Sequence, residues 1–207
     1  MHAQPRAYDA AVADALDDAC WELLHMARLR GGLVDAGSEV VVVRVVEMGF
    51  AARSPKGIGL TRKGLAAHAA WARVPAGDAE TAIERAYQRF LALNRELIRV
   101  CYDWQVRPGG APNDHSDPTY DWAIVDRLVA LDDRIGPILR GAAKGVTRFA
   151  TYRPRLRAAR VRVADGEVEW LTSPLVDSYH TVWMQLHEDL LLALGRDRAS
   201  EAISDQP

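Results

Sequence analysis

The chain has 207 residues, of which 49% are apolar and 26% are charged, and its formal net charge is −2 at pH 7. This balance is typical of a folded chain and excludes a disordered one, and the length suits one medium domain or two small ones, of which we expect two. No stretch of about 18 uncharged apolar residues could span a bilayer, and residues 1–8 lack the apolar segment of a secretory signal, so we expect a cytoplasmic protein without a membrane partner. Because the net charge is slightly negative, any contact with nucleic acid has to come from local basic clusters.

The first third of the chain contains two apolar segments separated by glycines. Residues 9–30 carry apolar side chains at spacings of three and four, which predicts a helix that ends at the glycine pair after it. Residues 38–48 are ambiguous, because Ser38 and Glu39 are typical of a helix start, whereas the valines of residues 40–46 favour a strand. We expect a helix, since the segments that follow make sense only after one.

A turn-rich stretch comes next. Gly49 can adopt the left-handed conformation that ends a helix, and residues 50–54 and 57–60 are short extended pieces around a Ser-Pro-Lys-Gly turn. Thr61 can cap a further helix over residues 61–73. This order of parts predicts the second half of a winged helix-turn-helix.

The rest of the chain is predicted to be helical, so the fold class is mainly α. Residues 74–78 break the pattern, and we place a domain boundary there, with a winged helix-turn-helix domain over residues 1–76 and an all-helical domain over residues 77–207. A long helix begins at Ala79. Residues 107–120 are too rich in helix breakers for any element and form the longest loop.

Three further helices are expected in this second domain. The Asp-Pro pair at residues 117–118 starts a helix that the Gly-Pro pair at residues 136–137 interrupts. Residues 147–164 follow helical spacing, although residues 161–170 also resemble a hairpin with an Asp-Gly turn, and we favour the helix. The Ser-Pro pair at residues 173–174 starts the last helix.

Two basic clusters are candidates for contact with phosphate. The first lies in the wing and, with the helix before it, supplies the expected DNA-binding residues: Ser38, Arg44, Arg53, Lys56, Arg62 and Lys63. A charged turn is also common on proteins that bind no DNA. The second cluster spans residues 140–162, where Arg153, Arg157 and Arg160 share a helical face. We expect these arginines to pair with acids such as Asp132 rather than to bind an anion.

The helix expected at residues 38–48 is poorly suited to reading bases. Its only polar residues are Ser38, Glu39, Arg44 and Glu47, whereas base edges are read by Arg, Asn, Gln, Ser or Thr. This composition favours contact with a protein partner over sequence-specific DNA recognition.

Aromatic and histidine side chains of the helical domain form a candidate pocket for a small-molecule effector. We expect it to contain Trp104, His115, Tyr179, His180 and Trp183, although such residues also fill helical cores and cap loops.

Acidic residues near His115 also invite a metal or acid-base interpretation, namely Asp114, Asp117 and Asp121. No histidine pair has the helical spacing of a metal site, although the loop could bring His115 beside His180. Cys20 and Cys101 are too far apart in sequence for a metal knuckle, and we expect both to be core thiols. We therefore expect no metal, no cofactor and no enzyme activity, and an enzyme remains a third possibility that depends on the two histidines.

The stretch from Val46 to Gly64 resembles the end of a MarR-type winged helix, whose pattern is a leucine-rich helix, a glycine, a wing and then Leu-Thr-x-x-Gly, here Leu60-Thr61-Arg62-Lys63-Gly64. The resemblance implies a DNA-binding transcriptional regulator that binds double-stranded DNA and pairs as a homodimer through helices at both ends. An effector or protein partner would then shift the population of dimers that bind DNA.

Residues 113–118 and 177–183 resemble helical regions that follow winged helices in actinobacterial proteins, some of them associated with phosphoenolpyruvate-utilising enzymes. This second resemblance implies an accessory role and transfers no catalytic residue. The alternative function is therefore a protein-interaction module of such a metabolic enzyme, with a winged helix that does not read DNA.

Overall fold

The computed structural model describes residues 16–31, 33–34, 38–55 and 57–196. The described chain is mainly helical with a small antiparallel sheet, which confirms the predicted mainly α class. Contacts divide it into two compact units: one runs up to Arg73 and also takes in the residues from Leu191 on, and the other is Val74–Leu190. Within the described residues, no helix is both long enough and apolar enough to cross a membrane.

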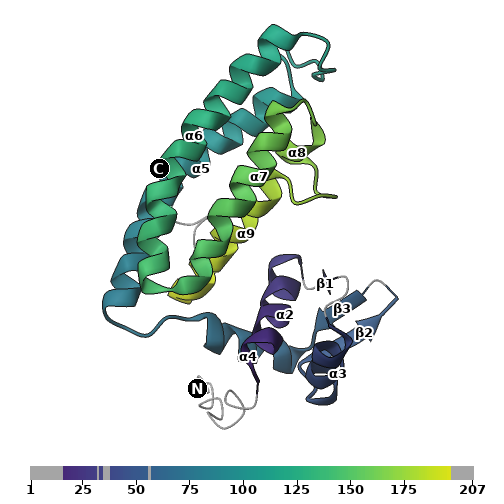
Figure 1. The fold of residues 1–207 in the computed structure, drawn as a ribbon, viewed down its shortest axis with the longest axis vertical. Coiled ribbons are helices and arrows are strands. Elements are labelled where there is room, and N and C mark those ends of the chain that lie inside the picture. Colours follow the sequence, from purple (N-terminus) through teal and green to yellow (C-terminus); the bar gives the residue numbers. More distant parts are fainter. Residues whose placement is uncertain (1–15, 32, 35–37, 56, 197–207) are drawn as a thin grey trace, which may run out of the picture. The chain divides into compact units, whose positions relative to one another are not determined.

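The first unit combines helices with the sheet (Figure 1). Its elements in chain order are α2 (Asp18–Leu29), β1 (Leu33–Val34), α3 (Glu39–Glu47), β2 (Ala51–Ser54), β3 (Gly57–Leu60) and α4 (Arg62–Ala72). The three strands are antiparallel in the order β1-β3-β2, with Ala51 opposite Leu60 and Ser54 opposite Gly57. The hairpin of β2 and β3 confirms the predicted extended pieces, whereas β1 was not predicted.

Helix α2 is shorter than the helix that the apolar pattern of residues 9–30 predicts. It begins at Asp18 because Asp17 acts as the N-cap, with Oδ1 accepting a hydrogen bond from Cys20 N at 3.0 Å. The prediction of a helix over residues 9–30 is therefore wrong at residues 16 and 17, and residues 9–15 lie outside the described part of the chain.

The valine-rich segment is helical, as predicted against its strand propensity. Val42 and Val45 of α3 are buried in a core that also contains Trp21 and Leu24 of α2 and Phe50. Burial of these side chains outweighs the few tenths of a kcal/mol per residue by which valine disfavours a helix.

The hairpin and α4 are joined by a close backbone contact. Thr61 Oγ1 accepts a hydrogen bond from Gly64 N at 3.1 Å and donates one to Gly49 O at 2.7 Å, while Thr61 N donates to Phe50 O at 3.0 Å. A Cβ atom on Gly64 would lie 1.8 Å from Phe50 O. The threonine and the glycine of the Leu-Thr-x-x-Gly pattern therefore have structural roles here.

The second unit consists of helices that pack on one another (Figure 1). Its elements are α5 (Asp78–Gln105), α6 (Pro118–Gly145), the 3-10 helix η1 (Thr147–Thr151), α7 (Tyr152–Ala164), α8 (Glu169–Thr172) and α9 (Tyr179–Leu194), of which α9 extends past the unit's last residue. Helix α5 packs along α6, α6 packs on η1 and α7, and α7 packs on α8. The helix predicted for residues 147–164 is confirmed, with η1 as its first turn, and the alternative hairpin is not formed.

Two predicted helix boundaries in this unit are wrong. Helix α6 continues through Pro137, because Ile135 and Ile138 are buried on either side of the proline and their packing offsets the hydrogen bond that proline removes. Helix α9 begins at Tyr179 rather than near residue 173, since Ser178 Oγ accepts from Thr181 N at 3.2 Å and starts the helix there. Leu175, which was expected on the apolar face of this helix, lies in a turn and is 91% exposed.

Removing the Thr61 hydroxyl is expected to destabilise the first unit. Thr61→Ala deletes the cap of α4 and the bond to Gly49 O, so the free energy of unfolding should fall by about 1–2 kcal/mol. Ser38→Ala is the matched control, because Ser38 occupies the N-cap of α3 without a side-chain capping bond. Urea unfolding followed by circular dichroism measures both, and equal losses would contradict the role given to Thr61.

Candidate functional site

Two of the predicted DNA-binding arginines are engaged by acids from other segments. Arg44 Nη1 lies 2.6 Å from Asp17 Oδ2, and Arg53 Nη2 lies 2.5 Å from Glu39 Oε1. About half of each arginine side chain remains exposed. Their charges are therefore balanced locally although they are still accessible from solvent.

The remaining wing cations differ in their surroundings. Lys63 Nζ donates to Met48 O at 2.7 Å and lies 4.5 Å from the centre of the Phe50 ring, so this lysine helps to close the end of α3. Arg62 is exposed on the first turn of α4. Lys56 lies outside the described residues.

Helix α3 presents apolar side chains to solvent. Val40 is 78% exposed and Val43 is 38% exposed, and exposed Ser38 and Glu47 lie at the two ends of the same helix. None of these side chains is one that commonly makes bidentate contacts with bases.

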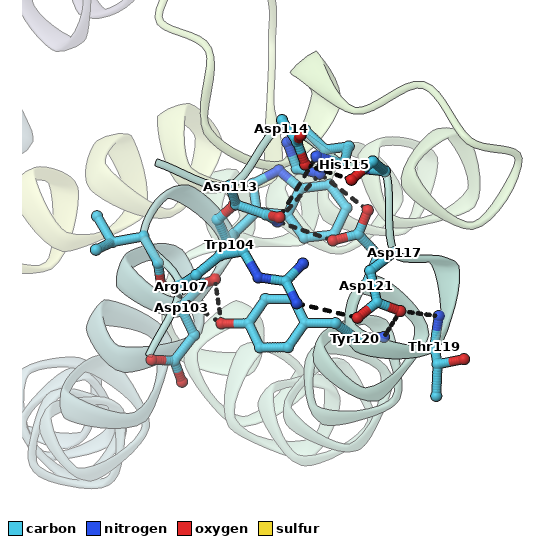
Figure 2. A network of polar contacts seen from close by, with 12 residues as sticks. Asp103, Trp104, Arg107, Asn113, Asp114, His115, Asp117, Thr119, Tyr120 and Asp121 are labelled. Carbon is cyan, nitrogen blue, oxygen red and sulfur yellow. Dashed lines mark hydrogen bonds and ion pairs between the residues drawn. The ribbon is translucent and has the colours of Figure 1, made fainter. Parts of the chain in front are cut away.

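A second candidate site lies in the loop between α5 and α6, where Asn113, His115 and Asp121 point toward one another (Figure 2). His115 Nδ1 lies 2.9 Å from Asp121 Oδ2, and Asn113 Nδ2 donates to Asp121 Oδ1 at 2.8 Å and to Trp104 O at 3.0 Å. The His115 ring also packs on Trp104, with 4.5 Å between ring centres. The carboxylate and the histidine are mostly buried, with 15% and 25% of their side chains exposed.

The loop itself is held in place by its flanks. Arg107 Nη2 donates to Asp117 Oδ2 at 3.0 Å and its guanidinium lies over the Tyr120 ring, while Tyr120 OH donates to Asp103 O at 2.9 Å (Figure 2). The bond from Arg107, followed by the backbone amide of Tyr120, lowers the pKa of Asp117. The N-cap of α6 therefore stays ionised at neutral pH, and the loop is anchored at both ends.

The backbone at His115 is in the left-handed region, with φ of 58°. A residue with a Cβ atom pays about 1–2 kcal/mol for this conformation. The Asp121 and Asn113 bonds hold it there, and such local strain is most often found where a side chain is positioned for a function.

A cavity of about 200 Å³ opens beside this network. Its lining residues come from α5, the loop, α6, α7 and the turn before α8: Trp104, His115, Pro118, Asp121, Trp122, Val125, Val163, Gly166 and Val168. Apart from the indole N–H groups, the polar side chains among these lining residues are those of His115 and Asp121. No lysine or arginine is among the lining residues.

The other predicted effector residues lie elsewhere in the unit. Tyr179 and Trp183 are fully buried and stack on each other, and Trp183 Nε1 donates to Asn94 Oδ1 at 2.9 Å. Burial lowers the pKa of His180. The structure thus brings Trp104 and His115 together in one cavity but does not place Tyr179, His180 or Trp183 among its lining residues.

One network residue was not among the predicted site residues, namely Asn113, which orients Asp121. Trp122 belongs to the aromatic side chains of the helical domain from which a pocket was expected, and it lines the cavity. The acidic residues around His115 and the resemblance of residues 113–118 were the signals that pointed to this loop. Among the described residues, no group of three or more His, Cys, Asp or Glu side chains could hold a metal ion.

Half of the second basic cluster is directed into the helical unit, namely Arg148, Arg153, Arg155 and Arg160, whereas Arg140, Lys144, Arg157 and Arg162 are exposed. Asp132 of α6 is 1% exposed. Its Oδ1 accepts hydrogen bonds from Arg153 Nη1 at 2.6 Å and from Tyr179 OH at 3.3 Å, and its Oδ2 lies 3.2 Å from Arg160 Nε. Burial, then the charge of Asp132, raises the pKa of Tyr179 well above its usual value, so the phenol stays protonated. The expectation that Arg153 and Arg160 pair with Asp132 is confirmed.

A similar group surrounds Asp189 of α9, which is fully buried. Arg148 Nε donates to Oδ1 at 2.9 Å, and Tyr152 OH donates to Oδ2 at 3.0 Å. Arg155 Nη2 donates to Gln185 Oε1 at 2.6 Å. These contacts tie α9 to η1 and α7.

Comparisons with protein-family models, with proteins of known function and with solved structures give no match. The winged-helix resemblance therefore depends on the residues of this chain alone.

Neutralising Asp132 is expected to destabilise the helical unit strongly. Asp132→Asn keeps the shape but leaves Arg153 and Arg160 without a buried counter-charge, which should cost about 3–5 kcal/mol. The matched control is Glu96→Gln, because Glu96 pairs with Arg134 at 2.5 Å on the surface, where such a pair contributes about 0–1 kcal/mol. Urea unfolding compares the two, and losses of similar size would contradict a structural role for the buried network.

Proposed function

We propose that the protein is a DNA-associated regulator whose first unit is a winged helix that contacts the phosphate backbone. The observation that carries the proposal is the three-stranded β1-β3-β2 sheet flanked by α3 and α4, with Arg53 on the hairpin and Arg62 beside it both exposed. A helix, a hairpin and a capped helix follow one another in the order that the sequence pattern predicted for a wing.

The ion pairs of Arg44 and Arg53 do not prevent contact with DNA. Both pairs are about half exposed, and exposed pairs contribute only about 0–1 kcal/mol. A phosphate group can therefore replace Asp17 or Glu39 as the partner of each arginine at little cost in free energy.

The composition of α3 argues against base readout by this helix. Its exposed side chains include Glu39, Val40, Val43 and Glu47, of which the glutamates repel phosphate and the valines read only methyl groups. Binding would then depend mainly on released counterions, with modest sequence preference and a steep decline as salt rises.

The helical unit is the proposed regulatory part. It would dimerise or bind an effector, and either event would shift the population of arrangements in which two wings bind one duplex. The loop cavity beside His115 is the place in this unit where a small molecule would bind.

Removing two wing cations is expected to weaken DNA binding. Arg53→Ala with Arg62→Ala should lower affinity for a fluorescent duplex and reduce the slope of log affinity against log salt by about 2, because about one counterion is released per phosphate contact. The matched control is Arg85→Ala with Arg89→Ala, which removes the same charge from exposed positions of α5. Fluorescence anisotropy at several salt concentrations measures both.

The proposal fails if the wild-type chain shows no salt-dependent binding at low ionic strength. It also fails if the α5 control loses as much affinity as the wing variant, since binding would then follow net charge and not the wing.

The second candidate is a protein-interaction module of a metabolic enzyme, for which a phosphoenolpyruvate-utilising enzyme is the example given by the sequence resemblance. The exposure of Val40 and Val43 on α3 favours it, because exposed apolar side chains on one helix are suited to a protein partner. In that case, cells carrying the Arg53 and Arg62 substitutions would behave as the wild type does.

A further inference from the structure

The orientation of His115 decides what the loop cavity can bind. A carboxylate only accepts hydrogen bonds, so the contact between His115 Nδ1 and Asp121 Oδ2 places a proton on Nδ1. Neutral His115 then carries a lone pair on Nε2, and this nitrogen has no hydrogen-bond partner among the described residues. His115 lines the cavity, and Nε2 is the acceptor that this side chain has left to offer a ligand.

The carboxylate beside the cavity is already occupied. Asp121 Oδ1 accepts from Asn113 and Oδ2 accepts from His115, and the two amide hydrogens of Asn113 go to Asp121 and to Trp104 O. Each oxygen of Asp121 thus already accepts one hydrogen bond, and the carboxylate serves to orient the histidine. Asn113 fixes Asp121 in turn, so the acceptor on His115 does not depend on a flexible side chain.

The walls of the cavity exclude an anionic ligand. Trp104, Trp122, Val125, Val163 and Val168 supply apolar surface. No lysine or arginine lines the cavity, so a carboxylate or phosphate would lose its hydration without gaining a counter-charge there. A flat ring between the indoles would bury apolar surface and have aromatic contacts on its faces.

The cavity has room for a single ring. An apolar cavity of ~150 Å³ accommodates one benzene molecule, so a volume of about 200 Å³ leaves room for a ring with one or two small substituents.

We propose that this cavity binds a neutral single-ring aromatic molecule whose O–H or N–H group donates a hydrogen bond to His115 Nε2. Binding of such a ligand does not require the protein to contact DNA. Only the use of the ligand as an effector rests on the proposed function. Asp121 is a positioning residue in this site, and His115 is the residue that contacts the ligand.

Three probes of similar shape test the chemistry of the site on the full chain without DNA. They are p-cresol, which carries a donor, toluene, which lacks it, and p-toluate, which is anionic. We expect p-cresol to bind about 3–10-fold more tightly than toluene, the gain from one hydrogen bond, and at least about tenfold more tightly than p-toluate. NMR titration of the indole N–H signals of Trp104 and Trp122 measures the three affinities.

Variants then test whether the donor group of the ligand contacts Nε2 of His115. His115→Phe keeps a ring against Trp104 but removes the acceptor, so p-cresol affinity should fall to that of toluene, while toluene affinity stays unchanged. His180→Phe is the matched control, since His180 does not line the cavity, and it should alter neither affinity. In the wild-type chain, the Nε2 signal of His115 in a histidine-selective nitrogen spectrum should move on addition of p-cresol.

Equal binding of p-cresol and toluene, tighter binding of p-toluate, or no binding of any probe at millimolar concentration would overturn the proposal. If His115→Phe does not fold, the comparison of probes on the wild-type chain and the Nε2 signal still decide it. Because the titrations contain no DNA, their failure is separate from failure of the wing to bind a duplex.

Discussion

Two buried aspartates hold the helical unit together. Asp132 of α6 and Asp189 of α9 each accept bonds from a tyrosine hydroxyl and from an arginine that precedes or belongs to α7. Moving a carboxylate from water into the protein interior costs free energy unless its oxygens accept hydrogen bonds there. The helices that supply these donors can therefore shift very little relative to one another. The segment from η1 through α7 is rich in arginine because it supplies most of the positive charge for these interior acids.

This constraint also explains how the loop site is built. Val163 near the end of α7, Gly166 and Val168 form one side of the cavity, and α6 forms another, and the ion pair of Asp132 with Arg153 ties α7 to α6. The strained His115 and its partner Asn113 lie in the loop before α6, and their partner Asp121 lies in the first turn of α6. The loop thus depends on long-range contacts as well as on its own hydrogen bonds.

The sequence was sufficient for most helices because periodicity records which face is buried. The valines of α3 were predicted to be helical because the wing that follows requires a helix before it, and burial of Val42 and Val45 outweighs their local propensity. Prediction from the sequence failed at Pro137, where packing on both sides maintains a helix through a breaker, and at residue 173, where Ser178 provides the cap instead. The pairing of Arg153 with Asp132 was anticipated, and so was a pocket with Trp104 and His115. Most of the other walls of the cavity were not, because they come from separate segments that no local pattern connects.

The junction between the hairpin and α4 bears on how the Leu-Thr-x-x-Gly pattern is interpreted. Thr61 is required to fasten the helix to the strand, and Gly64 is required because the carbonyl of Phe50 occupies the space of a side chain. Both demands arise inside the chain and hold whether or not the protein contacts nucleic acid. Proteins that share this pattern are therefore expected to share this backbone contact between hairpin and helix, whatever ligand each of them binds.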